Sequence, residues 1–420
     1  MRILHTCHTY WPHSDGVAIV VQRISEGLAA RGHEVTVATG PAAATPVEER
    51  HGVQIRRFDV RGNEATGYAG DTAAYERFIE SFRSDVMLNY AAQICTTDLV
   101  FPLLPRLACR KVIAPCGYSG LRHEVYAAYF SRMPARLRAY DAAVYHSRTY
   151  QDARFAAGNH LDNSVFINNG ADVLDPPNAD DSFRTKYGIR ETTLLLTVGR
   201  VEVEKGQDLV LQAFRSCKLQ DAALVLVCPE IGPFARETLR TAPGPIHKPL
   251  RKVRAVLFEP VARRRPGRAN RMEWRIPGRK SVYVLAGLPR RDVLSAYADA
   301  DLFVFGSRVE CSPLVIIEAM ASGTPFVSTR VGNVPEMPGG VIVDDAVGMA
   351  EAIDRLVPMG SEWHRLSQAG RTAWKRDHTW EHVVGQYARL YERLLSSRPR
   401  LAHGGLRGAA GPDSPHGRRP

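Results

Sequence analysis

The stretch VECSPLVIIE, residues 309–318, is where we expect the chemistry of this chain, and it follows a short apolar run, LFVF, at residues 302–305. A short apolar run of this kind is typical of a strand buried inside a parallel sheet. Pro313 suits the first turn of a helix, because its missing N–H is not needed there. The stretch therefore predicts a strand, a loop and a helix, with Glu310 on the loop at the strand's carboxyl end and Glu318 inside the helix.

The start of this helix indicates a place for an anion. A helix N-terminus offers free N–H groups and a partial positive charge, which suit a diphosphate. Carboxylates on either side, Glu310 and Glu318, would then hold hydroxyls of two sugars, one on each side of the phosphates. An amphipathic helix with a solvated Glu at each end has the same spacing, so the spacing alone leaves both interpretations open.

Composition narrows the class of protein. The 420 residues are 45% hydrophobic and 24% charged, which is typical of a globular chain of two or three domains. The start MRILH predicts a strand rather than a signal peptide, and no apolar run is long enough to predict a membrane-spanning helix. The seven cysteines form no C-x-x-C pair, so we expect a reducing compartment, the cytoplasm, and no structural zinc.

The formal charge of +11 is uneven. Residues 248–280 hold twelve Lys/Arg and two Asp/Glu, and the tail 397–420 holds five Arg and one Asp. Within the first segment, residues 250–258 have one apolar helical face. Two interpretations stay open: a surface helix followed by a solvated arm, or attachment to an anionic membrane surface. Nucleic-acid binding is a third, but few aromatic residues are available for base stacking, so we expect no nucleic acid.

Strand and helix patterns alternate twice along the chain, which predicts an α/β protein with two doubly wound, Rossmann-like domains facing across a cleft. We expect the first domain at residues 1–175 and the second at 186–378, with the basic insertion 248–280 in the second. A helix over 380–395 and a disordered tail at 397–420 should follow. Ligands of such sheets bind beyond the carboxyl ends of the strands, here in the cleft.

Two polar motifs in the second half carry possible chemistry. The turn GRVEVEKG, residues 199–206, follows a strand and lets Arg200 and Lys205 clamp a diphosphate, although a solvated loop has the same pattern. The D-x-D of residues 299–301 resembles a metal motif, but it precedes its strand and so lies away from the cleft. We therefore predict no metal site, and the absence of Gly-x-Gly-x-x-Gly after a strand argues against a dinucleotide oxidoreductase.

Together these motifs resemble the retaining GT-B glycosyltransferases of family four, the glycosyl transferases group 1. The resemblance covers residues 1 to about 395, and its most specific part is the pair of glutamates, Glu310 and Glu318, with seven residues between them. It rests on the following segments, in order: Asp15-Gly16, Asn169-Gly170-Ala171-Asp172, 199–206, 300–304, 310–318 and 319–325.

The resemblance implies transfer of a sugar from a nucleoside diphosphate sugar to a glycan or lipid-linked acceptor, with retention and without a metal or other cofactor. It implies a role in cell-envelope or exopolysaccharide assembly and a last helix that crosses back to the first domain. Arg200 and Lys205 would hold the diphosphate, Glu310 would face the donor sugar and Glu318 would hold the ribose. The remaining implied donor-binding residues are Gly16, Gly199, Ser312, Pro313, Leu314 and Val315.

Three departures from the family pattern bear on this assignment. Many members have two glycines where this chain has Asp15-Gly16, and the basic segment 248–280 is longer than usual. Many also have His-Gly where this chain has Pro115-Cys116-Gly117, which leaves the sugar-contacting histidine unassigned among His8, His123 and His146. A GT-B epimerase or phosphorylase is the alternative within enzymes.

Overall fold

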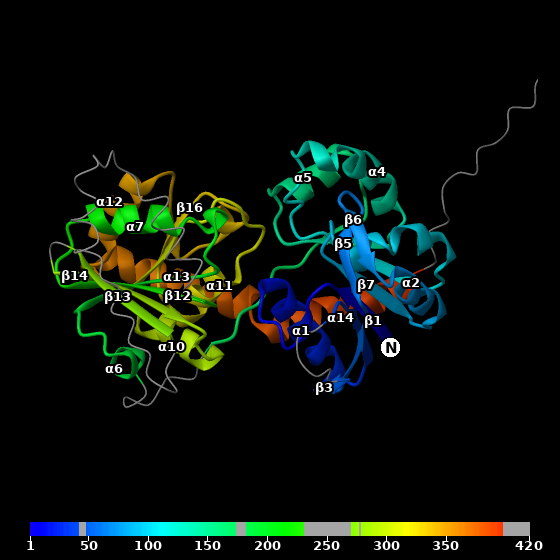
Figure 1. Cartoon of the computed structure of the whole chain (residues 1–420), viewed down its shortest axis with the longest axis horizontal. Coiled ribbons are helices and arrows are strands. Elements are labelled where there is room, and N and C mark those ends of the chain that lie inside the picture. Colours follow the sequence, from blue (N-terminus) through cyan, green and yellow to red (C-terminus); the bar gives the residue numbers. More distant parts are fainter. Residues whose placement is uncertain (42–47, 174–181, 231–269, 277–278, 398–420) are drawn as a thin grey trace, which may run out of the picture.

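A computed structural model describes residues 1–41, 48–173, 182–230, 270–276 and 279–397. The chain forms two α/β domains side by side, with the early part of the sequence in one and the later part in the other (Figure 1). Their two sheets share no strand. The predicted fold, two Rossmann-like parallel-sheet domains, is confirmed.

The sheet of the N-terminal domain has the strand order β10-β9-β8-β7-β1-β2-β4-β3, and its pairs are parallel except β3 on β4. A separate antiparallel hairpin, β5–β6, stands beside it. The strands are β1 (Arg2–Cys7), β2 (Glu34–Thr39), β3 (Glu49–Arg50), β4 (Val53–Arg57), β5 (Val60–Asn63), β6 (Gly67–Gly70), β7 (Val86–Tyr90), β8 (Arg110–Ala114), β9 (Ala142–Tyr145) and β10 (Ser164–Phe166).

Helices cover both faces of this sheet, because each helix buries one apolar stripe against it. The first helix begins where the Asp15 carboxylate accepts a hydrogen bond from the Ala18 amide at 3.1 Å. The elements are α1 (Gly16–Ala29), α2 (Thr72–Ser81), α3 (Cys95–Asp98), α4 (Ala127–Arg138) and α5 (Gln151–Gly158), with the 3₁₀ turns η1 (Phe101–Arg106) and η2 (Glu124–Tyr126).

The sheet of the C-terminal domain has the order β13-β14-β12-β11-β15-β16-β17, parallel except for β13 on β14. Its central strands are fully buried, as expected for near-continuous apolar runs covered on both faces. The strands are β11 (Thr193–Val198), β12 (Ala222–Cys228), β13 (Asn270–Ile276), β14 (Lys280–Ala286), β15 (Leu302–Phe305), β16 (Phe326–Thr329) and β17 (Gly340–Val343).

The helices of this domain pack in two layers, α7 and α12 on one face of the sheet and α10, α11 and α13 on the other (Figure 1). The elements are α6 (Phe183–Tyr187), α7 (Gln207–Ser216), α10 (Arg290–Asp299), α11 (Leu314–Ser322), α12 (Ala346–Leu356) and α13 (Ser361–Asp377), with the turns η4 (Val203–Lys205) and η5 (Val334–Glu336).

The last helix, α14 (Trp380–Ser396), crosses back to the N-terminal domain and packs on α1 (Figure 1). A Cβ on Gly27 of α1 would lie 2.6 Å from the Val384 side chain, so the glycine permits this close approach. The Tyr391 hydroxyl lies 3.1 Å from Nε2 of His5 on β1. The predicted crossing of the last helix is therefore confirmed.

The basic segment needs a correction. Residues 270–276, predicted as part of an insertion, form the edge strand β13 instead, because the segment pairs along its whole length with β14. Residues 248–269, including the apolar-faced helix expected at 250–258, lie outside the described residues, as do 398–420 of the expected tail. Among the helices that the structure describes, none is long and apolar enough to cross a bilayer.

Candidate functional site

The loop between β15 and α11 lies at the carboxyl end of β15, as predicted. Pro313 precedes the helix as its N-cap instead of lying in the first turn, with an extended backbone conformation. Within the described part of the chain, no side chain caps this end of α11. The amides at Leu314 and Val315 therefore start a helix whose N-terminus has no side-chain acceptor of its own, which suits an external anion.

Lys205 and Glu310 are brought together beside this helix end. Lys205 Nζ lies 2.6 Å from Glu310 Oε1, and the Ser307 hydroxyl donates to the same oxygen at 3.1 Å. A Cβ on Gly206, which has a φ of +60°, would lie 1.9 Å from the carbonyl oxygen of Gly306. Only glycine allows these two loops to touch backbone to backbone, and this contact places the cation and the carboxylate in reach of each other.

Arg200 lies on the same loop, but the structure gives it a different partner. It forms an ion pair with Glu202 at 2.9 Å, and its side chain is 62% exposed, against 22% for Lys205. The Gln207 side chain donates to the Arg200 carbonyl at 2.7 Å and ties the turn to the start of α7. Gly199, the first residue of this turn, has a φ of +159°. Lys205 is thus already held next to Glu310, whereas Arg200 remains on the surface.

Glu318 is buried in α11, and its partner is a residue that the sequence analysis missed. Arg290 Nη2 lies 2.5 Å from Glu318 Oε1. Burial disfavours the Arg290 charge, yet the Glu318 carboxylate raises the pKa of Arg290 above its ordinary value. Arg290 is the first residue of α10 and follows the carboxyl end of β14. A basic residue just after a parallel strand is the sequence signal that could have identified it as a site residue.

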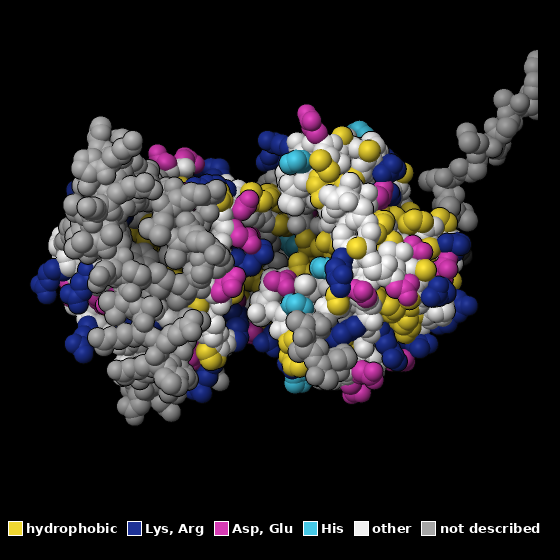
Figure 2. All heavy atoms as spheres, viewed as in Figure 1, with side chains coloured by type: hydrophobic (Ala, Val, Ile, Leu, Met, Phe, Trp, Pro, Cys, Tyr) yellow, Lys and Arg dark blue, Asp and Glu magenta, His cyan; other side chains and the backbone are white. Residues whose placement is uncertain are grey.

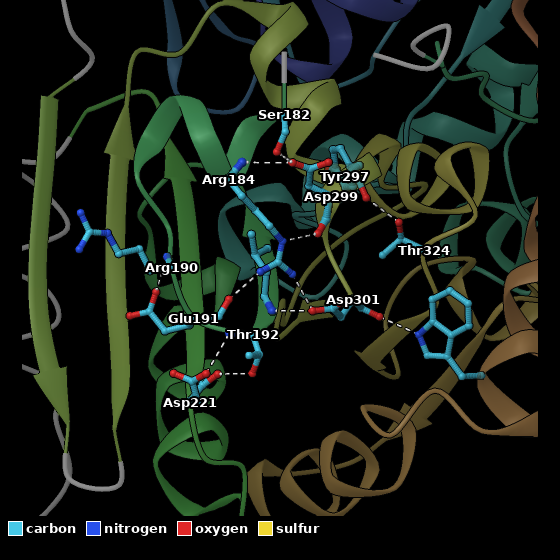
Figure 3. Close-up of polar contacts among 12 residues, drawn as sticks. Ser182, Arg184, Arg190, Glu191, Thr192, Asp221, Tyr297, Asp299, Asp301 and Thr324 are labelled. Carbon is cyan, nitrogen blue, oxygen red and sulfur yellow. Dashed lines mark hydrogen bonds and ion pairs between the residues drawn. The ribbon is translucent and has the colours of Figure 1, made fainter. Parts of the chain in front are cut away.

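The Asp299 and Asp301 carboxylates of the D-x-D support the fold and lie at the amino end of β15. Asp299 accepts hydrogen bonds from the Ser182 hydroxyl at 2.8 Å and the Arg184 amide at 3.1 Å, and Asp301 accepts from the Arg184 guanidinium at 2.8 Å (Figure 3). Asp301 also accepts from the Leu194 amide at 2.7 Å. These bonds fasten α6 to the sheet. Within the residues described, no group of three His, Cys, Asp or Glu side chains is placed to hold a metal ion.

Across from Glu310, the N-terminal domain contributes the loop after β8. Cys116, Gly117 and Tyr118 all have positive φ, at 60°, 102° and 54°. The buried Asp152 carboxylate accepts from the Gly117 amide at 2.9 Å, and the Gln151 side chain donates to the carbonyls of Gly117 and Tyr118 at 2.8 Å. The start of α5 therefore holds a backbone conformation that the loop would otherwise resist.

The two walls touch at this loop. A Cβ on Gly117 would lie 2.8 Å from the Cys311 Cβ, so the glycine lets the loops approach each other. In the space-filling view a furrow separates the two domains, and acidic and basic side chains gather on the C-terminal side of it (Figure 2). The sequence predicts a site in the cleft between domains, and the structure brings the Gly117 loop of the N-terminal domain against Cys311, the residue next to Glu310.

The three candidate histidines differ in their surroundings. His146 is buried, with Nε2 3.0 Å from the Tyr90 hydroxyl and Nδ1 2.8 Å from the Ile167 carbonyl oxygen, and burial lowers its pKa. His8 is part-buried, 3.5 Å from the Cys95 sulfur, and burial lowers its pKa too. His123 is exposed at the start of η2. His146 Nε2 lies 4.0 Å from the Cys116 sulfur, so His146 is the candidate beside Cys116, where the chain departs from the family's His-Gly. Both of its ring nitrogens already have hydrogen-bond partners.

The contacts of Asp15 explain why this chain has Asp where many family members have glycine. The Asp15 carboxylate caps α1 and accepts a hydrogen bond from the Thr9 hydroxyl at 3.1 Å, which a glycine could not do. A Cβ on Gly16 would meet nothing within 4 Å, so the backbone there borders open space. On the opposite wall, the Ser312 hydroxyl accepts from the Asn333 side chain at 3.0 Å. Gly16 therefore stays accessible, whereas Ser312 already has a partner.

Comparisons with known proteins agree with this geometry. A family model described as "Glycosyl transferase 4-like domain" matches residues 15–156, and one described as "Glycosyl transferases group 1" matches residues 263–358. An MMP alpha-(1->4)-mannosyltransferase from Mycolicibacterium hassiacum is 30% identical over 122 residues, which are 27% of this chain and 30% of that protein. A D-inositol 3-phosphate glycosyltransferase from Xylanimonas cellulosilytica is 26% identical over 54% of this chain and 50% of its own length. The matched parts thus span half or less of these relatives.

Solved structures are similar over almost the whole chain. Sucrose-phosphate synthase from Thermosynechococcus elongatus superposes with a TM-score of 0.72 at 19% identity, covering 94% of this chain and 99% of the other. HepE from Anabaena, solved in complex with UDP and glucose, superposes with a TM-score of 0.67 at 15% identity, covering 94% and 100%. The 4-like model in the N-terminal domain and the group 1 model in the C-terminal domain show that the chain belongs to the glycosyl transferases group 1, and its two parallel-sheet domains and crossing last helix give it the GT-B fold.

Proposed function

We propose that this protein transfers a sugar from a nucleoside diphosphate sugar to an acceptor, with retention of the anomeric configuration and without a bound metal. The observation that carries the proposal is Lys205 beside Glu310 at the uncapped N-terminus of α11. A helix N-terminus and a nearby ammonium group both attract a diphosphate. The carboxylate next to them accepts hydrogen bonds from sugar hydroxyls.

The chemistry follows from where the charge develops. As the glycosidic bond breaks, negative charge grows on the leaving diphosphate, and preorganised positive groups stabilise it. Lys205 and the α11 amides would stabilise this charge from the positions they occupy in the structure. Arg200 would also contact the diphosphate after its side chain turns away from Glu202. Glu318, oriented by Arg290, would accept from the ribose hydroxyls. Retention is what the family resemblance implies, and the acceptor would approach from the side of Gly16.

The test is a panel of sugar nucleotides, beginning with UDP-glucose because HepE was solved with UDP and glucose. A bound donor should raise the melting temperature by mass action. Proton NMR of the reaction with that donor and a mixture of glycan and lipid-linked acceptors should then show the free nucleoside diphosphate and a product with the donor's anomeric configuration. An epimerase would yield an isomeric sugar nucleotide without acceptor. Absence of stabilisation by every donor would contradict the proposal.

We further propose a cytoplasmic, peripheral enzyme whose acceptor is a glycan or lipid-linked sugar. The support is the charge of residues 248–269 in the sequence, with eight Lys/Arg and one Asp/Glu. Each basic residue near an anionic surface contributes about 1 kcal/mol to attachment. The protein should sediment with anionic vesicles at low salt and not with neutral ones. Removing residues 251–268, which leaves β13 in place, should abolish this, and unchanged sedimentation would contradict it.

A further inference from the structure

A short segment after β16 reaches from the C-terminal domain to the N-terminal domain. The Glu336 carboxylate accepts hydrogen bonds from the Ser147 hydroxyl at 2.5 Å, from the Thr149 hydroxyl, and from the Thr149 amide at 3.3 Å. Ser147 is only 3% exposed, so Glu336 reaches a buried hydroxyl of the other domain. Hydrogen bonds to an ionised carboxylate are stronger than those between neutral groups.

Asn333, three residues earlier, joins the same contact to the candidate donor site. Its side-chain amide donates to the His146 carbonyl at 3.0 Å and to the Ser312 hydroxyl at 3.0 Å, and its backbone amide donates to the Cys311 carbonyl at 2.9 Å. Asn333 is 3% exposed. One buried side chain therefore touches both the N-terminal domain and the loop that leads into α11.

On the N-terminal domain, Ser147 links Glu336 to the start of α5 and through it to the wall around Gly117. The Ser147 hydroxyl also accepts from the amides of Thr149 and Tyr150, at 3.1 and 3.0 Å, and so fixes the turn that starts α5. Two residues further on, Asp152 holds the Gly117 amide. An unbroken series of contacts thus runs from Glu336 through the start of α5 to the loop that faces Glu310.

We propose that Glu336 and Asn333 are positioning residues that hold the two domains at the separation at which Gly117 and Glu310 face the same donor sugar. We call this group of four residues the interdomain clamp: Glu336 and Asn333 from the C-terminal domain, and Ser147 and Thr149 from the N-terminal domain. Loss of Glu336 should affect the sugar and not the nucleotide, because Glu336 contacts the N-terminal domain, whereas the groups assigned to the diphosphate and ribose all lie in the C-terminal domain. That the bound molecule is a donor sugar rests on the proposed function, whereas the contacts of the clamp are independent of it.

The first experiment uses Glu336→Ala in the full chain. Small-angle X-ray scattering should show a larger radius of gyration than for the wild type. The kcat/KM for the sugar nucleotide should fall by roughly tenfold to a hundredfold, as expected when a reacting group is misplaced by about 1 Å. The affinity for free UDP should stay unchanged. The control is Glu362→Ala, because Glu362 pairs with Arg355 at 3.0 Å within the C-terminal domain and its loss should change none of these readouts.

The second experiment approaches the clamp from the other domain. Ser147→Ala combined with Thr149→Val should reproduce the expansion, and adding Glu336→Ala should cause no further loss, because all three changes break the same contacts. Glu336→Gln, which keeps one acceptor oxygen, should fall between wild type and Glu336→Ala. Wild-type compactness in both the Glu336→Ala and the Ser147/Thr149 variants, or fully additive losses of kcat/KM, would overturn the clamp. Failure of the wild type to bind any nucleotide would instead contradict the proposed function, and scattering would still test the clamp.

Discussion

The two walls of the furrow differ in their electrostatics. The C-terminal wall holds fixed charges in pairs, Lys205 with Glu310 and Arg290 with Glu318. The N-terminal wall, around Gly117, holds buried groups whose charged forms burial disfavours. Burial raises the pKa of Cys116 to about 12 and that of Asp152 to about 6. This difference supports the proposal that the C-terminal wall binds a charged diphosphate, whereas the N-terminal wall supplies shape and backbone groups.

The largest expected effect is on the charged wall. Lys205→Ala should lower turnover by roughly a hundredfold or more, as for other preorganised groups that stabilise developing charge. Arg200→Ala should have a comparable effect if Arg200 joins the diphosphate on binding. Lys186→Ala is the matched control, because Lys186 pairs with Asp292 at 2.7 Å within the same domain. Steady-state rates decide this, and wild-type turnover in Lys205→Ala would remove its assignment.

The two glutamates of this wall should separate nucleotide from sugar. Glu318→Ala should weaken free UDP and the sugar donor alike, by roughly tenfold, because a ribose hydrogen bond to a charged group is lost. Glu310→Ala should leave the affinity for free UDP unchanged and weaken the donor only. Two calorimetric titrations per variant measure this, and the reverse pattern would exchange the two roles.

Changes in the N-terminal wall should affect the free energy of unfolding and its pH dependence. Burial raises the pKa of Asp152 to about 6, above the roughly 3.9 of an unfolded Asp, so the folded protein keeps a proton that the unfolded chain loses. Stability therefore falls as the pH rises through this window, by at most about 3 kcal/mol. Asp152→Asn removes this contribution, and its melting temperature should fall less between pH 4 and 6 than that of the wild type.

The same window contains a second titration, which serves as a control. Burial also raises the pKa of Asp98, a residue beneath the β5–β6 hairpin, to about 6. Part of the fall in melting temperature should therefore remain in Asp152→Asn. Equal slopes in wild type and variant would show that Asp152 is ionised in the folded protein throughout this range.

The smallest expected effect is that of chelation. The Asp299 and Asp301 carboxylates already bind Ser182, Arg184 and the Leu194 amide, which leaves them committed to the fold (Figure 3). Turnover in EDTA should equal that in buffer, whereas Asp301→Asn should lower the melting temperature without changing UDP affinity. Loss of activity in EDTA, restored by a divalent ion, would contradict the metal-free proposal.

Much of the fold could be predicted from the sequence, because buried parallel strands are continuous apolar runs. The strand at 302–305 was predicted with its observed bounds. β13 was missed because its charged residues Arg271, Glu273 and Arg275 belong to the basic segment 248–280, although apolar and charged residues alternate along it as is typical of a half-buried strand. The hairpin β5–β6 was missed because its four-residue strands contain glycines and are largely exposed.

The site could be predicted only where sequence spacing fixes geometry. The spacing of Glu310 and Glu318 along the β15–α11 unit placed one carboxylate on the loop and the other inside the helix. Arg290 and Glu336 were missed because their partners are 28 and about 190 residues away, and a contact across such a distance depends on packing that no local pattern records. The Lys205–Glu310 pair likewise depends on the contact between Gly206 and Gly306.

The central claim is that the C-terminal wall binds a nucleoside diphosphate through Lys205 and the start of α11. Calorimetric titration of UDP, with GDP and ADP as alternatives, into the wild type, Lys205→Ala and Lys186→Ala tests it most directly. We predict one-site binding to the wild type, unchanged in Lys186→Ala and weaker by roughly tenfold or more in Lys205→Ala, because a charge-assisted contact is lost. Equal affinity in Lys205→Ala and wild type, or no binding of any of the three to the wild type, would contradict the claim.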